Sequence, residues 1–353
     1  MRRAGLLTAI VVAGVTVAVA AAQQRGEGNT GPQRGGGGGR GGPRIPPTGT
    51  IEKIKPNLYK IGGAGSNTTV FVTADGVVLV DTKLANNGEA ILTQVKSVTD
   101  KPVTTIINTH VHPDHNGSND YFKATRPMIQ VVTHENTKKW VAANPKANPA
   151  WMPDTTFTDK TTLGKGKDRI DLYYFGAGHT NGDAFVVFPE LRAMCIGDLM
   201  AWNMAPLIDP ATGGSVIALP DTLEKAIKGI KNVDLVIEGH GNVNTWQGLR
   251  SYAEFNRALL NAAKTALSRQ ETPEQALAEL EKNKKFDVFM KEELLKDLEY
   301  GGTPKSRALI NLNVAFQELK GEPVTTNFGP PRGGTPPPAP GGGPAPTPPP
   351  SGK

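Results

Sequence analysis

Apolar runs separated by short polar breaks occupy the middle of the chain, and their spacing predicts alternating strands and helices. β-Branched runs at 70–73 and 77–80 flank Ala74-Asp75-Gly76, a sequence typical of a hairpin turn. Residues 89–99 have helical spacing, and residues 221–231 predict a second helix capped by Asp221. Further strands are expected at 103–108, 128–132, 168–175, 185–188, 193–196 and 235–238. Strands interleaved with helices indicate a layered α/β or α+β domain.

The pattern becomes helical from Ser251 onward. The sequence Thr272-Pro273-Glu274-Gln275 combines a proline at the first helical position with the spacing of a capping box. Gly301-Gly302 interrupts the pattern, and residues 305–320 predict a last helix. We therefore expect a domain at residues 50–250 and a helical extension at 251–326 that packs on it.

The first 22 residues have the pattern of a secretory signal peptide. Arg2 and Arg3 precede an apolar run, and Ala20 and Ala22 fit a cleavage site before Gln23. The run is also marginally long enough for an N-terminal membrane anchor, which is the alternative. The signal peptide predicts a periplasmic or secreted protein with no stable membrane insertion after cleavage.

Composition separates the two ends of the chain from its middle. Residues 23–49 hold 11 Gly and 4 Pro, and residues 327–353 hold 7 Gly and 11 Pro, so both predict disordered segments. The formal charge of the whole chain is +6, but residues 50–326 alone carry −1. A near-neutral domain argues against nucleic acid as a partner. The single cysteine, Cys195, excludes an intramolecular disulfide and is expected to be a buried thiol within a strand.

Histidines follow the predicted strands, and they suggest a metal site. Three of the six histidines lie in one hexapeptide, His110-Val111-His112-Pro113-Asp114-His115. His179, Asp198 and His240 each follow another strand and have glycine beside them, which allows close approach of the backbone. Strand ends are common places for α/β sites, and imidazole and carboxylate are natural ligands of Zn²⁺ and similar metals. The sixth, His134, is expected to be a surface or capping residue.

The blocks HVHPDH, GHT, GD and GHG occur in an order that resembles the metallo-β-lactamase superfamily, from about residue 51 to residue 246. The resemblance implies an α/β fold in which two mixed β-sheets, flanked by helices, form an αββα sandwich, here with a C-terminal helical extension. It also implies two metal ions, with zinc expected and iron or manganese as alternatives. A hydroxide shared by the metals would be the nucleophile.

The resemblance implies a role for each matching position. Asp114 would also orient the nucleophile or receive its proton, and Asp81 would support the histidine loop from behind. The family's usual glycine after Asp-Thr is Lys83 here, a departure that concerns the local turn. The implied ligands are His110, His112 and His179 for the first metal, Asp114, His115 and His240 for the second, and Asp198 for both.

Asp198 also bears on the substrate. β-Lactamases of the family usually lack this bridging carboxylate, so its presence favours a hydrolase of esters, lactones, thioesters or amides. A β-lactamase is the main alternative, partly because export would place it where such antibiotics act. A diiron redox protein and a nuclease are further alternatives, but His112 is retained where diiron relatives carry Glu. We expect a small-molecule substrate; the oligomeric state is open, and Trp151, Met200, Trp202 and Met204 either line a cleft or pack within loops.

Overall fold

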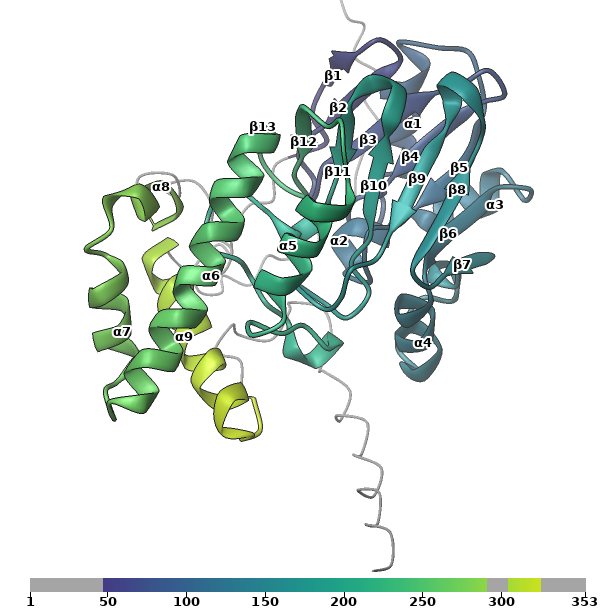
Figure 1. Ribbon diagram of the computed structural model, residues 1–353. Helices are drawn as coiled ribbons and strands as arrows, with labels where there is room; N and C mark the ends of the chain where they lie inside the picture. The colour runs from purple at the N-terminus through teal and green to yellow at the C-terminus, as the bar shows by residue number, and fades with distance from the viewer. Residues whose placement is uncertain (1–46, 291–303, 325–353) are drawn as a thin grey trace, which may run out of the picture. The chain divides into compact units, whose positions relative to one another are not determined.

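Two mixed sheets lie at the centre of the molecule (Figure 1). The computed structural model describes residues 47–290 and 304–324. Within these residues, the first sheet has the strand order β1 (Ile51–Lys55), β2 (Leu58–Ile61), β3 (Thr68–Val72), β4 (Val77–Val80), β5 (Val103–Ile107), β6 (Gln130–His134) and β7 (Thr155–Phe157). The second has the order β13 (Val243–Thr245), β12 (Leu235–Ile237), β11 (Ala193–Cys195), β10 (Phe185–Phe188), β9 (Ile170–Tyr173) and β8 (Lys160–Leu163).

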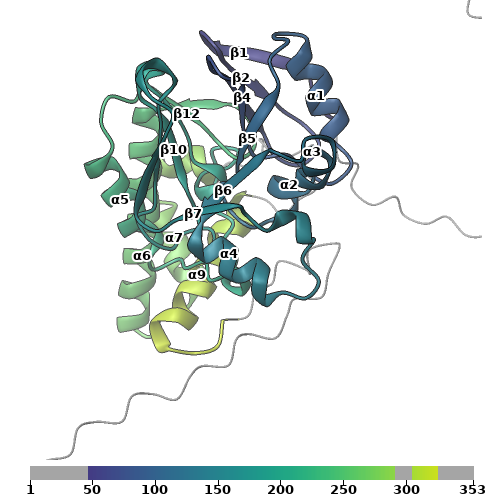
Figure 2. The ribbon, with the colours of Figure 1, turned by 90° about the vertical axis from the view of Figure 1, so that its right-hand side faces the viewer.

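Helices cover the outer faces of both sheets (Figure 2). Helices α1 (Gly88–Lys96) and α3 (Asn119–Thr125) share a core with the first sheet. Helices α5 (Leu219–Gly229) and α6 (Trp246–Ser268) share a core with the second sheet, and α7 (Pro273–Leu280) and α9 (Pro304–Lys320) pack on α6. The remaining α-helices described are α2 (Pro113–Asn116), α4 (Glu135–Ala143) and α8 (Asp287–Met290).

The period-2 alternation of buried strands produces these layers. In β4, Val78 and Val80 point between the sheets, while Val77 and Leu79 point toward α1 and α3. Strand β10 divides its side chains between the inner core and the helical layer in the same way. The sequences of β4 and β10 are therefore continuous apolar runs, because both faces of these strands are buried. The expected αββα sandwich with C-terminal helices is confirmed.

Some element boundaries differ from the prediction for identifiable reasons. Strand β6 begins at Gln130 rather than at residue 128, because Met128 is 86% exposed. Helix α5 begins at Leu219, so the predicted cap at Asp221 is wrong. Asp221 instead lies in the first turn of α5 and forms an ion pair with Arg257 of α6.

Short, partly polar strands were not predicted. Strand β1 is an edge strand whose sequence IEKIK buries little, and β7 and β8 are similarly short and polar. Helix α6 begins five residues earlier than expected, because Thr245 caps it through Gly248 N. The predicted capping box at Thr272 is confirmed, with Gln275 bonding back to Thr272 N.

Several predictions concern residues outside those described. They are the signal peptide at 1–22, nearly all of the segment at 23–49, the break at Gly301-Gly302 and the tail at 327–353. At the end of the segment 23–49, Gly49 N donates a hydrogen bond to Gly62 O at 2.8 Å. Among the helices in the described ranges, none combines the length and apolar character needed to cross a bilayer.

Candidate metal centre

The histidine loop begins where β5 ends. His112 is extended, as expected for a residue before proline, and Pro113 starts the single turn of α2. This turn carries Asp114 and His115 in its first three positions, so they leave the loop in a different direction from His110 and His112. The local sequence therefore separates the loop's four polar side chains into two pairs.

The second sheet brings further side chains to the same place. Strands β11 and β12 are parallel, and Cys195 is in register with Ile237. Asp198 and His240 each follow three residues later, at neighbouring strand ends. Glycine is required between them: a Cβ on Gly239 would lie 1.9 Å from Asp198 Oδ1.

Seven side chains meet between the sheets in two groups joined by a carboxylate. In the first group, His112 Nδ1 lies 3.2 Å from His110 Nε2 and 2.9 Å from His179 Nε2. In the second group, Asp114 Oδ2 lies 3.3 Å from His240 Nε2 and 3.8 Å from His115 Nε2. The first group is His110, His112 and His179; the second is Asp114, His115 and His240.

Asp198 lies between the two groups. Its Oδ1 is 3.2 Å from His115 Nε2, and its Oδ2 is 3.2 Å from His240 Nε2 and 3.7 Å from His179 Nε2. The structure thus brings together all seven side chains that the sequence singled out as ligands.

This arrangement fits divalent cations. His115 Nε2 and Asp198 Oδ1 are buried, and neither makes a hydrogen bond within the described part of the chain. Buried polar atoms without partners are costly, and a cation between them would satisfy both. Imidazole nitrogens and carboxylate oxygens are the donors that Zn²⁺ takes in catalytic sites.

The outer ring nitrogens of the histidines are held from behind. His115 Nδ1 lies 2.7 Å from Asp81 Oδ2, and Asp81 also accepts from Thr109 N and Oγ1. His112 Nε2 lies 2.8 Å from Asp209 Oδ2, and Leu207 O accepts from His179 Nδ1. Such contacts fix the tautomer and the ring orientation of metal-binding histidines.

Asp209, Leu207 and Trp202 were not predicted to support the histidines. The Trp202 ring stacks on the His240 ring at a centroid distance of 4.1 Å. Asp209 resembles any other loop aspartate in the sequence, so the sequence gives no signal of its role. Of the two supporting aspartates, only Asp81 could be identified from the sequence, because it lies in a recognisable block. Leu207 acts through its carbonyl, for which the side chain gives no signal.

The two groups differ electrostatically. Burial and neighbouring imidazoles hold the pKa of His110 well below its usual range, and burial and His112 lower that of His179 to about 4. Burial opposes protonation of His240 too, but Asp198 and Asp114 outweigh it and raise its pKa to about 9. In His115, Asp198 and Asp81 likewise overcome burial and raise the pKa. In His112, burial is outweighed by Asp209, which raises the pKa, so without a metal protons favour His112 and the second group over His110 and His179.

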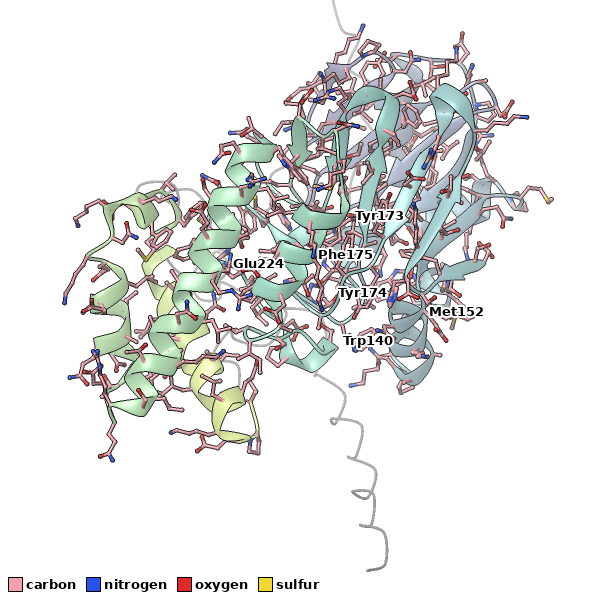
Figure 3. The ribbon with its side chains drawn as sticks, viewed as in Figure 1. Trp140, Met152, Tyr173, Tyr174, Phe175 and Glu224 are labelled. Carbon is pink, nitrogen blue, oxygen red and sulfur yellow. The ribbon has the colours of Figure 1, made fainter. Side chains whose placement is uncertain are left out.

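Other singled-out residues have structural roles. His134 is buried, not at the surface, but it caps α4 by accepting from Asn136 N. Its ring stacks on that of Tyr174, a residue labelled in Figure 3. Cys195 is buried between the sheets as predicted, and burial raises its pKa to about 12. Met200 and Met204 are fully buried, and Met200 belongs to the core of the helical layer, so both pack within loops.

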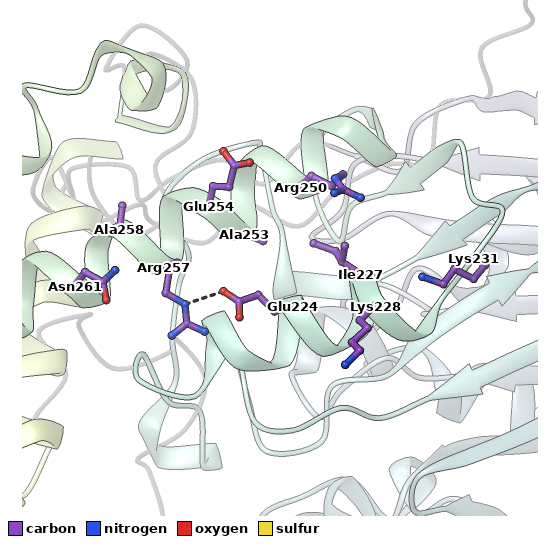
Figure 4. Close-up of a pocket in the computed structure, with 10 residues that line it drawn as sticks. All are labelled: Glu224, Ile227, Lys228, Lys231, Arg250, Ala253, Glu254, Arg257, Ala258 and Asn261. Carbon is purple, nitrogen blue, oxygen red and sulfur yellow. Dashed lines mark hydrogen bonds and ion pairs between the residues drawn. The ribbon is translucent and has the colours of Figure 1, made fainter.

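A surface groove lies away from the histidines. It has a volume of about 540 Å³ between α5 and α6, and the Glu224–Arg257 ion pair crosses it (Figure 4). Its described lining contains none of the seven clustered side chains. We therefore place the candidate site at the histidine cluster and not in this groove.

A model of the metallo-beta-lactamase superfamily matches residues 61–240, which is half of the chain and contains the whole cluster. The chain belongs to this superfamily. It is accordingly a metallo-hydrolase by family. The matched region ends at His240, so α6 to α9 lie beyond it.

Curated relatives include a metallo-beta-lactamase type 2 from Bacillus sp. (strain 170), 27% identical over 181 residues, covering 50% of this chain and 67% of that protein. A metallo-beta-lactamase type 2 from Bacteroides fragilis is 29% identical over 192 residues, covering 53% and 74%. A solved metallo-beta-lactamase from Pontibacter korlensis is 24% identical and has a TM-score of 0.52, with 59% of this chain and 98% of that chain covered. The structural likeness shows the fold.

Lys83, the departure from the superfamily pattern, ties a loop to the centre. Its side chain is fully buried, and Nζ donates to three carbonyls, those of Ile61, Gly63 and Ser66, at 2.5–2.8 Å. The loop at 62–67 passes so close to Asp114 that a Cβ on Gly65 would lie 2.8 Å from Asp114 Cβ. Burial lowers the pKa of Lys83 to about 7. A side chain that replaces glycine thus becomes the anchor of this loop.

We expect Lys83→Met to lower the free energy of unfolding by about 2–4 kcal/mol, because three buried carbonyls lose their common donor. Methionine keeps the side-chain length and the left-handed backbone of residue 83. Urea unfolding of the metal-free protein measures the change. Lys60→Met is the matched control with an expected loss of about 1 kcal/mol, because Lys60 Nζ donates to one carbonyl, that of Gly241. Equal losses in both variants would contradict the anchoring role of Lys83.

Proposed function

We propose that the protein is a dinuclear zinc hydrolase that cleaves an ester, lactone, thioester or amide bond. The observation that supports this most is the pair of three-residue groups with Asp198 between them. The first group would hold one ion, the second group the other, and Asp198 would contact both. When bound, two such ions supply an ionised water at neutral pH and polarise the bond to be cleaved.

Asp114 is the proposed catalytic residue. About 30% of its side chain is exposed, whereas those of Asp198 and His115 are almost fully buried, so Asp114 can reach a substrate. Burial favours its neutral form, but His115 and His240 outweigh burial and hold its pKa well below the usual range. Asp114 is therefore a carboxylate at neutral pH. It would accept the proton of the attacking water and return it to the leaving group.

The choice of substrate depends on two opposing observations. Asp198 would occupy the bridging position, and a carboxylate there favours esters, lactones, thioesters or amides in proteins that resemble this superfamily. The similar proteins from Bacillus and Bacteroides are named metallo-beta-lactamases, which favours β-lactams as the second candidate. We place the first class ahead, because Asp198 contacts both groups directly and identity to the named relatives is below 30%.

A substrate panel tests the proposal. The zinc-loaded protein is assayed against lactones, thioesters, phosphodiesters and nitrocefin, and we expect measurable kcat/KM for a lactone or thioester. Asp114→Asn should lower that kcat/KM by at least about 100-fold, because the proton acceptor is lost. Asp159→Asn, at an exposed position, is the matched control and should retain full activity.

Two outcomes of the panel contradict the proposal. Activity that survives Asp114→Asn would refute the assigned mechanism. Preferential turnover of nitrocefin would favour the β-lactamase candidate over the first one.

Metal binding should release protons. At pH 7.5 the metal-free second group holds protons, because the pKa of His240 is raised to about 9 and that of His115 is raised as well. Zinc affinity should therefore rise with pH up to about 9, by roughly tenfold per unit for each proton displaced. Calorimetric titration in buffers of different ionisation enthalpy counts the protons. His134→Gln is the control and should release the same number of protons as the wild type, because His134 caps α4 and is not one of the seven clustered side chains. Zinc binding without proton release would contradict the assignment.

We also propose export of the protein. Support comes from the sequence of residues 1–22, with cleavage expected after Ala22. Mass spectrometry of the protein recovered from a bacterial host should find Gln23 at the mature N-terminus. Retention of Met1 on membrane-associated protein would instead support the N-terminal anchor.

A further inference from the structure

The loop that follows Asp198 contacts three of the clustered histidines. This supporting loop, residues 200–218, connects the strand-end aspartate to α5. Its Trp202 ring stacks on His240 at 4.1 Å with an interplanar angle of 24°. Its Leu207 carbonyl accepts from His179, and its Asp209 carboxylate lies 2.8 Å from His112 Nε2. The orientation of one histidine in the second group and of two in the first therefore depends on this loop.

The supporting loop is irregular and needs external contacts to keep its shape. Its only described helical turn is η5 (Pro210–Thr212), and Trp202 and Asn203 have positive φ angles of 54° and 51°. Such backbone persists only where the surroundings hold it in place. Glu238 holds the start of the loop by accepting from Asn203 N at 2.9 Å.

One face of helix α9 contacts the supporting loop at three places along its length. The Arg307 guanidinium lies 5.1 Å from the centroid of the Trp202 ring. Asn311 Nδ2 donates to Pro206 O at 2.7 Å, one peptide away from the carbonyl that accepts from His179. Glu318 accepts from Ser215 Oγ, Val216 N and Ile217 N at 2.7–3.2 Å. Positions 307, 311 and 318 differ by four and seven residues, the spacing of one helix face.

These contacts are polar, and those of Arg307 and Asn311 are made by buried side chains, which makes them specific. Arg307 and Asn311 are at most 1% exposed, and their neighbours Ala308, Leu312 and Ala315 fill the helical core. Apolar packing would fix α9 on α6 without these three side chains. All three side chains contact residues 202–217, which indicates that they hold the supporting loop in addition to packing the helix.

We propose that α9 is a positioning element of the metal centre: Arg307, Asn311 and Glu318 fix the supporting loop, and the loop holds His112, His179 and His240 for metal binding. This inference rests on the proposed metal centre and adds to it a part of the chain beyond the superfamily match. The line of contact from α9 to a histidine is shortest through Arg307, Trp202 and His240.

The test uses the full-length protein, depleted of metal and titrated with Zn²⁺ and with Co²⁺. Asn311→Ala should raise the dissociation constant for Zn²⁺ about tenfold, the lower end of the effect of removing a direct outer contact of a ligand. It should also shift the visible absorption bands of bound Co²⁺, which report ligand geometry. Asn313→Ala is the matched control: it removes the same group from the same helix, but Asn313 is exposed and donates within α9 to Leu309 O. It should match the wild type in both measurements.

A second variant tests the path through the aromatic ring. Arg307→Met should weaken Zn²⁺ binding to the second group and alter the Co²⁺ spectrum. It should cause no further loss of affinity in a protein that already carries Trp202→Leu. Wild-type affinity and spectra in Asn311→Ala and Arg307→Met, with only the unfolding free energy lowered, would overturn the proposal and leave α9 as a packing element. Failure of the wild-type protein to bind either ion would overturn the metal centre itself, so the two failures are distinguishable.

Discussion

Clustering of seven imidazole and carboxylate groups, five of them buried, is the constraint on which the rest of the structure depends. His110, His179, His115 and Asp198 have almost no contact with water, and their donor atoms face one another. Burial penalises both a lone carboxylate and a lone imidazolium, so the cluster must balance its charges internally. Without a metal it does so with protons on His112 and on the second group, where the pKa of each imidazole is raised; bound cations would take their place. The histidines therefore link folding, proton binding and metal binding in one equilibrium.

The fold brings the clustered side chains together at strand ends of both sheets. Each sheet contributes parallel neighbours, β4 with β5 and β11 with β12, whose carboxyl ends meet on the same side. Asp81 at the end of β4 can then hold both the histidine loop, through Thr109, and His115 itself. The apolar alternation of the same strands closes the layers behind the cluster and keeps water out. The same strands thus serve both purposes: their middles form the apolar core, and the loops at their ends carry the clustered side chains.

The sequence identifies the seven clustered side chains, but it does not identify the residues that hold them in place. All seven clustered side chains were predictable because each lies in a loop that follows an apolar strand, and His110 to His115 lie within one short block. Their role as ligands stays a prediction. The partners that hold them were not predictable, because a carbonyl such as Leu207 O carries no sequence signal and Arg307 lies over a hundred residues from Trp202. Weakly apolar edge strands such as β1 were missed for a related reason: they bury too little to show a period.

The supports also come from separate parts of the chain, which has a thermodynamic consequence. His115 depends on β4, His112 and His179 on the supporting loop, and that loop on α9 near the end of the described chain. An ion that binds the cluster only when these parts are assembled adds its binding free energy to the folding of all of them. Contacts at Lys83 and at α9 then matter for the same reason: each removes freedom from a segment that the ion would otherwise have to order on binding. A metal centre assembled from both ends of the fold would therefore be preorganised by residues that do not contact the metal, inside the superfamily match and beyond it.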